Sequence, residues 1–150
     1  MMTNMNGTGE KQEEGLGYLL TQVSFLKQRM VNAALRELEV TYMQFVILAG
    51  TYELGTDGSV VTQQTISDER RLDKAMVSNV VKTLIDKGLL LRTGHPTDGR
   101  AFTLELTPSG EEIARKGKEI AGRIDAGFFE CVDRNVLYES LKKLLKNNDR

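Results

Sequence analysis

Hydrophobic residues recur every three or four positions in several long stretches of the chain, the spacing that gives an α-helix one buried face. The first such stretch covers residues 16–38, and the second follows Thr41, whose hydroxyl suits a helix N-cap, and covers residues 45–52. The pattern predicts two helices here. The polar Gly/Asn/Glu-rich segment 1–14 precedes them, and we expect it to be a disordered leader.

Two further helices are predicted between Thr62 and Gly88. Thr62 has the chemistry of an N-cap for a short, polar helix over residues 63–71. A longer helix starts after Asp73, which can cap it, and ends before Gly88, which can adopt the left-handed C′ conformation. Its apolar face is the clearest in the chain: Met76, Val77, Val80, Val81, Leu84 and Ile85.

A β-hairpin is predicted after Gly88. Two β-prone stretches, 89–93 and 101–106, flank a loop that contains Pro96 and Asp98-Gly99. Residues 60–61, both valine, also favour a short strand. The second stretch alternates in polarity, so we expect one side of the hairpin to pack inward through Phe102, Leu104 and Leu106.

The last third of the chain predicts two more helices, one begun by Thr107-Pro108 and one capped by Asp133. The order of six helices with a hairpin after the fourth is that of a winged helix-turn-helix. We therefore predict a mainly α fold with a small β-hairpin wing (α+β). After the leader, a single domain covers residues 15–150, made of a winged core, 41–107, and terminal helices, 15–39 and 108–147.

The formal net charge of −1 hides an uneven distribution. Residues 1–69 carry four basic and nine acidic side chains, and residues 101–150 carry nine of each. Residues 70–100 carry seven basic and three acidic side chains, a net charge of +4. Positive charge thus concentrates in the helix and hairpin that would meet phosphates, while the nearly neutral whole limits unspecific binding.

Several protein classes are disfavoured. The single cysteine, Cys131, excludes an internal disulfide and favours a reducing compartment. The first residues have no apolar core of signal-peptide length, and the longest aliphatic run, 45–49, is too short to span a bilayer. We expect a soluble, cytoplasmic protein with no membrane partner. Metal-ligand spacings, nucleophile elbows and phosphate-binding glycine loops are missing, so we expect no enzyme, cofactor or metal site.

The exposed face of the helix after Asp73 suits the major groove of B-DNA, which is ~12 Å wide and admits one helix. Asn79 can form two hydrogen bonds with adenine, and the lysines can reach guanine or a phosphate. At the preceding helix start, amides and polar side chains can hold a phosphate. The candidate residues on these two helices are Thr62, Gln63, Gln64, Lys74, Ala75, Ser78, Asn79 and Lys82.

The hairpin adds Arg92, His95, Asp98 and Arg100 to the candidate DNA-binding residues. Arg100 can enter a minor groove, with the Asp98 carboxylate fixing its direction. Plainer interpretations stay open. Any solvated amphipathic helix shows such polar residues, the Asp98–Arg100 pair can be an ordinary hairpin ion pair, and His95, the single histidine, can be an exposed loop residue rather than a ligand.

Residues 62–110 resemble the DNA-binding region of the MarR family, regulators named for multiple antibiotic resistance. The stretch Asp98-Gly-Arg-Ala-Phe-Thr-Leu-Glu-Leu-Thr107 matches the family's wing pattern, Asp-x-Arg-x-x-x-aliphatic-x-Leu-Thr. Leu72–Ser78 and Leu84–Leu89 match the start and end of its recognition helix. The resemblance implies a homodimeric regulator, usually a repressor, whose first and last helices build the dimer and whose DNA binding small aromatic or phenolic effectors weaken.

The resemblance transfers the family's wing arginine to Arg100 and its partner to Asp98. Two departures are visible. Gly99 stands where many members have a second basic residue, so the wing is expected to hold DNA less tightly. The first helix has no cysteine of the kind the peroxide-sensing branch uses, which argues against hydroperoxide sensing, although Cys131 can still be modified.

The terminal helices independently favour assembly, because they offer more apolar surface than the winged core can cover. Two recognition helices related by a two-fold axis would address a pseudo-palindromic operator with half-sites ~34 Å apart. The alternative is an extended monomeric core. An effector pocket is plausible between the first, second and fifth helices, lined by residues that can equally be plain core: Phe25, Met30, Met43 and Phe45.

These patterns favour a sequence-specific, double-stranded DNA-binding transcription regulator, and the resemblance implies that it is a repressor released by a small-molecule effector. The alternative is a winged-helix module that binds another protein and not DNA, since one fold can serve either purpose.

Overall fold

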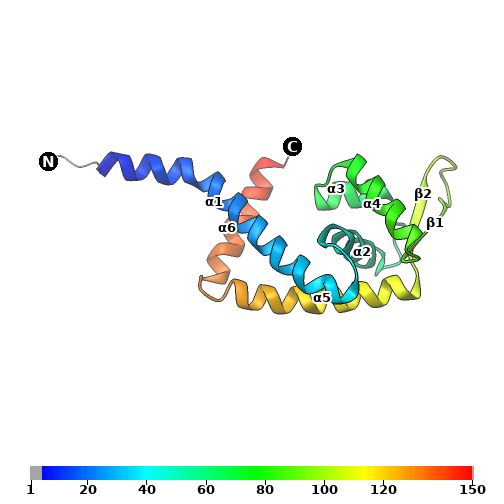
Figure 1. The fold of residues 1–150 in the computed structure, drawn as a ribbon. Coiled ribbons are helices and arrows are strands. Elements are labelled where there is room, and N and C mark those ends of the chain that lie inside the picture. The colour runs from blue at the N-terminus through cyan, green and yellow to red at the C-terminus, as the bar shows by residue number, and fades with distance from the viewer. Residues whose placement is uncertain (1–4, 150) are drawn as a thin grey trace.

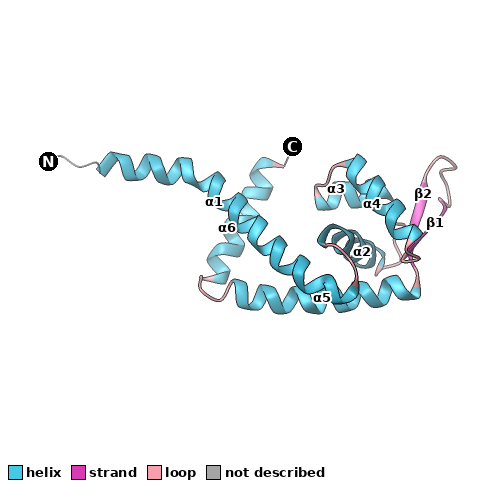
Figure 2. Cartoon of the chain, viewed as in Figure 1, coloured by secondary structure: helices cyan, strands magenta, loops and turns pink. Residues whose placement is uncertain are grey.

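The computed structural model describes residues 5–149, in which six α-helices and a two-stranded antiparallel hairpin form the fold (Figures 1 and 2). A short 3-10 helix, η1, follows the first α-helix. The mainly α, winged helix-turn-helix architecture predicted from the sequence is confirmed. The elements are α1 (Met5–Ala34), η1 (Leu35–Leu38), α2 (Tyr42–Gly55), α3 (Gln63–Arg70), α4 (Lys74–Asp86), β1 (Leu90–Gly94), β2 (Phe102–Leu106), α5 (Pro108–Phe128) and α6 (Arg134–Asn148).

Helices α2, α3 and α4 and the hairpin gather into one lobe, and α5 runs beneath that lobe and on past it (Figure 1). Helix α1 packs on α5, and α6 turns back from the end of α5, so these three helices form an arm on one side of the lobe (Figure 1). The core of the lobe, completed by η1, contains fully buried aliphatic side chains: Leu35, Ile47, Leu48, Ile66, Val77, Val81, Leu84 and Leu90.

Side-chain caps fix where the helices begin, as predicted. The hydroxyls of Thr41, Thr62 and Thr107 and the carboxylates of Asp73 and Asp133 each accept a hydrogen bond from a backbone amide in the first turn. Such caps satisfy amides that have no partner within their own helix. The glycine that follows α4, at position 88, has a φ of +75° and adopts the predicted left-handed conformation.

Two glycines of α5 let the lobe sit directly on that helix. Gly110 lies against the backbone of Leu89, and Gly117 lies against the ring of Phe45, leaving no space for a Cβ at either position. The Thr107 hydroxyl also donates to the Gly88 carbonyl, at 2.7 Å. The hairpin and α2 are therefore tightly joined to α5.

Three local features differ from the sequence-based predictions. Helix α1 begins at Met5, so residues 5–14 of the predicted leader are helical, whereas residues 1–4 lie outside the described part. This segment contains good helix formers (Glu10-Lys-Gln-Glu-Glu14) that can extend a helix already formed downstream. Residues 60–61 form no strand, because a single bond, from the Leu104 amide to the Val61 carbonyl, does not make a ladder.

The third difference concerns the hairpin, whose predicted inward side is only partly buried. Leu104 and Thr103 are buried, but Phe102 is 55% exposed because the outer half of the hairpin projects beyond the lobe (Figure 1). The strands pair Leu90 with Leu106 at the inner end and Gly94 with Phe102 at the outer end.

The arm differs from the lobe in what it exposes. Large apolar side chains lie open to solvent along α1 and α6: Leu16, Tyr18, Leu19, Leu20, Val23, Phe25, Leu26 and Met30 on α1, and Val136, Tyr138, Leu141, Leu144 and Leu145 on α6. Exposed apolar surface of this extent marks an interaction face.

Candidate nucleic-acid interface

Three elements that are separate in the sequence, the start of α3, the outer face of α4 and the hairpin, surround one open hollow of about 430 Å³. This surface contains six of the predicted DNA-binding residues, joined by two hairpin residues that the sequence analysis did not select. The lining residues are Thr62, Gln63, Gln64, Ser78, Lys82, Arg92, Ala101 and Phe102.

At the start of α3, some of the predicted polar groups already have protein partners. The Thr62 hydroxyl accepts a hydrogen bond from the Thr65 amide, at 3.1 Å, and the Thr65 hydroxyl in turn accepts one from the Thr62 amide, at 2.9 Å. The Gln64 amide donates to both oxygens of Asp68, at 2.8 and 2.9 Å. Thr62 and Gln64 thus shape the helix start, whereas Gln63 faces the hairpin.

Helix α4 presents its predicted contact residues outward. Lys74, Ala75, Asn79 and Lys82 are exposed, and Ser78 is half-buried at the base of the hollow. Among the side chains described, those of residues 15–149, none bonds the side-chain amide of Asn79. Its donor and acceptor are therefore available for a base edge, in the arrangement that reads adenine.

The base of the wing carries a fixed cation. Arg92 donates a hydrogen bond from its guanidinium to Gln63 Oε1, at 3.1 Å, and the guanidinium carbon lies 5.4 Å from the centre of the Phe102 ring. The guanidinium is exposed and sits at the edge of the hollow. It can bind a phosphate between α3 and the hairpin without first becoming ordered.

The wing tip is organised differently from the prediction. The Asp98 carboxylate accepts from the Arg100 backbone amide, at 3.0 Å, and not from its guanidinium. His95 holds the loop from inside, since its Nδ1 accepts from the amides of Thr97, at 3.2 Å, and Asp98, at 3.1 Å. Asp98 and His95 thus shape the turn, because these bonds close the loop, and Arg100 is exposed on it.

Sequence reasoning missed Phe102 and Ala101 as surface residues. Alternating polarity assigned Phe102 to the inner side of the hairpin, and it does lie on the same face as Leu104. Its position near the hairpin tip could have indicated that Phe102 is exposed, since it pairs with Gly94 at the end of the hairpin farthest from the core.

The four candidate effector-pocket residues do not come together. Phe25 is 66% exposed and Met30 is also exposed, both on α1, while Met43 is half-buried on α2. Phe45 packs in the core against Gly117 and is 7% exposed. Phe25 and Met30 thus belong to the open face of the arm, whereas Met43 and Phe45 belong to α2 in the lobe.

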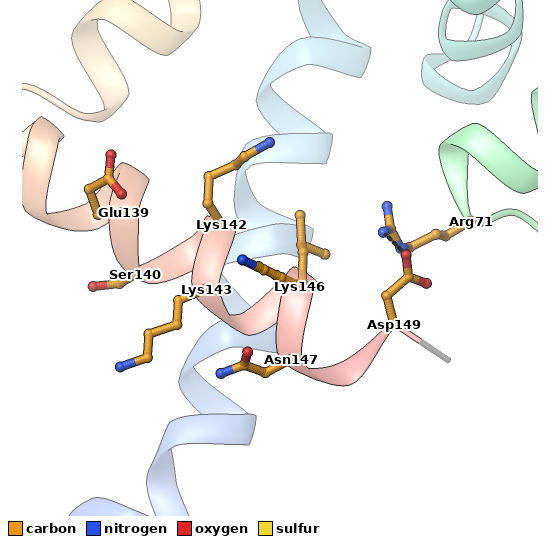
Figure 3. A pocket seen from close by; sticks show the side chains of 9 residues that line it. Arg71, Glu139, Ser140, Lys142, Lys143, Lys146, Asn147 and Asp149 are labelled. Carbon is orange, nitrogen blue, oxygen red and sulfur yellow. Dashed lines mark hydrogen bonds and ion pairs between the residues drawn. The ribbon is translucent and has the colours of Figure 1, made fainter.

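A larger hollow, about 840 Å³, lies between the end of α6 and the α3–α4 turn (Figure 3). Arg71, which ends α3 in a left-handed conformation with a φ of 53°, donates to the Asp149 carboxylate at 2.9 Å. This exposed ion pair links the turn before α4 to the arm. The remaining lining residues are Glu139, Ser140, Lys142, Lys143, Leu145, Lys146 and Asn147.

Glu53 joins α2 to two neighbouring helices. Its carboxylate pairs with Arg70 at the end of α3 and with Lys118 of α5, the latter at 3.3 Å. Partial burial raises the pKa of Glu53, but the hydrogen bonds and charges of Arg70, followed by those of Lys118, outweigh burial and lower the pKa below its usual range. The ionised form of Glu53 is therefore stabilised where the lobe meets α5.

The described part of the chain offers neither a metal centre nor a membrane-spanning helix. Among the side chains of residues 15–149, no group of three or more His, Cys, Asp or Glu is arranged to hold a metal ion. No helix there combines the length and the hydropathy needed to cross a bilayer.

Comparison with known proteins agrees with this geometry. The model of the MarR family matches residues 38–101. The uncharacterized HTH-type transcriptional regulator YdcH of Bacillus subtilis is 36% identical over 132 residues, which covers 87% of this chain and 90% of YdcH.

Two solved structures share the fold. A mutant of MarR from Escherichia coli, complexed with operator DNA, superposes with a TM-score of 0.76 at 22% identity, covering 93% of this chain and 97% of that one. CouR from Rhodococcus jostii, bound to p-coumaroyl-CoA, superposes with a TM-score of 0.77 at 22% identity, covering 89% and 91%. With its YdcH relative, its matching family model and its winged helix-turn-helix lobe, the chain belongs to the MarR family of transcription regulators.

Proposed function

We propose that this protein binds double-stranded DNA sequence-specifically, as a homodimer, and represses transcription from the operator it occupies. The proposal rests on the continuous surface formed by the start of α3, the outer face of α4 and the wing. Polar and basic side chains of all three elements meet there, and the Asn79 side-chain amide has no partner within residues 15–149. The MarR complex with operator DNA supports the same use of the fold.

The residues of this surface have different roles in the proposal. Asn79, Ser78 and Ala75 read base edges in the major groove, with Lys74 and Lys82 at guanine or a phosphate. Gln63 and Arg92 contact the phosphate backbone of the DNA, and Arg100 enters the minor groove. Thr62, Gln64, His95 and Asp98 act by shaping the helix start and the wing.

The dimer is part of the proposal because the apolar faces of α1 and α6 have no cover in one chain. A second copy would bury them. It would also place two α4 helices, related by a two-fold axis, opposite half-sites ~34 Å apart. A small organic effector is the proposed release signal, as the CouR complex with p-coumaroyl-CoA suggests for this fold. We propose no catalytic activity and a cytoplasmic location, where the operator would be.

The experiment is selection of bound duplexes from a random pool, followed by binding titrations with two variants. Asn79→Ala should accept a wider range of sequences, because a bidentate base contact contributes about 1–3 kcal/mol of discrimination. Arg100→Ala should weaken binding to all sequences alike. It should also reduce the slope of log K against log salt concentration by about 1 per subunit. Unfolding curves serve as the control, since both side chains are exposed. Unchanged binding by both variants would remove this assignment.

A further inference from the structure

We propose that Phe102 is a positioning residue: its ring, together with Gln63, holds the Arg92 guanidinium ready for one backbone phosphate at the base of the wing. The inference deepens the proposed function and rests on it. It concerns a residue that the sequence pattern assigns to the core and that the structure leaves more than half exposed.

The strand register explains the contact. Gly94 pairs with Phe102 and Arg92 pairs with Leu104, so Arg92 and Phe102 are diagonal neighbours on one face of the hairpin. Diagonal neighbours are within reach of aromatic and long side chains. Because Gly94 has no side chain, the space across from Phe102 is open, and the ring can lean toward Arg92, whose guanidinium carbon lies 5.4 Å from the ring centre.

Two contacts act on Arg92 from different directions. The guanidinium carbon lies 5.4 Å from the centre of the Phe102 ring, within cation–π range, and Gln63 Oε1 accepts one of the guanidinium hydrogen bonds at 3.1 Å. Most N–H donors of the guanidinium remain for a phosphate, which arginine can bind through two parallel hydrogen bonds. A long side chain normally loses rotamer freedom on binding, so a side chain that is already held loses less.

The wing tip shows the contrast. Arg100 is anchored through its backbone amide, and within residues 15–149 its guanidinium has no hydrogen-bond or ion-pair partner. Gly99 adds no second cation beside it. The wing therefore carries one held cation at its base and one unheld cation at its tip, and Phe102 and Gln63 together make that difference.

The test is a double-mutant cycle between Phe102 and Arg92, measured by fluorescence anisotropy over a range of salt concentrations. The probe is a duplex that the wild-type protein selects from a random pool. F102I keeps a β-preferring apolar side chain but removes the ring, F102Y keeps the ring, and R92K keeps the charge but loses the planar group. R92A completes the cycle.

We expect F102I and R92K each to bind about threefold more weakly per subunit, about tenfold for a dimer, with a salt slope close to that of wild type. R92A should reduce the slope by about 2 for a dimer, because one phosphate contact per subunit is lost. F102Y should bind within about twofold of wild type. In the R92A background, F102I should have no further effect, because Phe102 acts through Arg92.

Other outcomes overturn the inference. F102I binding like wild type, or F102I and R92A losses that multiply in the double variant, would show that Phe102 is neutral or acts by another route. If F102I fails to fold, F102L takes its place in the same cycle. A folded wild-type protein that selects no duplex would instead refute the proposed function, so the two failures are distinguishable.

Discussion

The lobe and the arm of this molecule differ in how far their large apolar side chains are buried. In the lobe, aliphatic side chains from α2, α3, α4 and β1 are buried, and few large apolar side chains, among them Phe102, remain exposed beside polar and basic groups. In the arm, α1 and α6 each expose a row of large apolar side chains. The lobe is complete within one chain and the arm is not. The lobe therefore carries the proposed recognition surface, and the arm carries the proposed assembly surface.

The largest effect should come from placing a charge on the arm. Leu144→Glu puts a carboxylate on the apolar face of α6, where the wild-type side chain is 53% exposed in one chain. A buried, unpaired charge is strongly unfavourable, so the variant should be monomeric. Loss of bivalent binding should weaken operator affinity by about 10²-fold or more. Light scattering and anisotropy measure the two effects.

The matched control is Lys143→Glu on the polar side of the same helix, where it lines the open hollow beside Arg71. It should leave the oligomeric state unchanged. A Leu144→Glu protein that stays dimeric would contradict the assignment of α6 to the interface.

A smaller effect tests how tightly the lobe is joined to α5. Gly110→Ala would force a Cβ into the Leu89 backbone, and backbone cannot move aside as a flexible side chain can. Overpacking of this kind costs about 1–3 kcal/mol of unfolding free energy. Gly122→Ala, on the same helix, meets nothing within 4 Å and should stabilise by up to about 1 kcal/mol through helix propensity. Urea unfolding compares the pair, and equal stabilities would refute the close junction.

The smallest effect concerns Glu53 at the junction of α2, α3 and α5. Its pKa is lowered in the folded state, so the stability it contributes is present above its ordinary value of 4.5 and is lost as the pH falls through the folded pKa. Glu53→Gln should cost under about 1 kcal/mol at neutral pH, since the carboxylate side chain is 42% exposed and solvent screens it. The difference from wild type should disappear well below pH 4.5.

Glu119→Gln is the control, an exposed change on α5 that lies outside the ion pairs of the described residues. The measurement is the unfolding free energy of each variant, relative to wild type, at neutral and at acidic pH. A Glu53→Gln deficit that is the same at both pH values would contradict an electrostatic role.

Local chemistry made most of the fold predictable. Capping residues such as Thr62 and Asp73 act within one helical turn, and the left-handed φ of Gly88 is a property of that residue, so sequence alone located these helix ends. Residues 60–61 show the limit of that reasoning: their valines favour a strand, but they receive a single bond from Leu104, which no local pattern reveals.

The candidate site was predictable at the level of elements and less so for individual side chains. Helix periodicity placed Asn79 and Lys82 outward, as the structure has them. The partners of Asp98 and Arg92 could not be predicted, because they depend on the closed loop and on a neighbour 29 positions away in sequence, Gln63. Phe102 was assigned to the core because alternation specifies the face of a strand and not how far the core extends along it.

The central claim is that two copies of the α4 surface bind one duplex together. Hydroxyl-radical footprinting of a selected duplex tests it most directly. The proposal predicts two protected patches of similar strength, related by the pseudo-two-fold of the sequence and centred ~34 Å apart. A single protected patch, or none with a folded protein at saturating concentration, would contradict it.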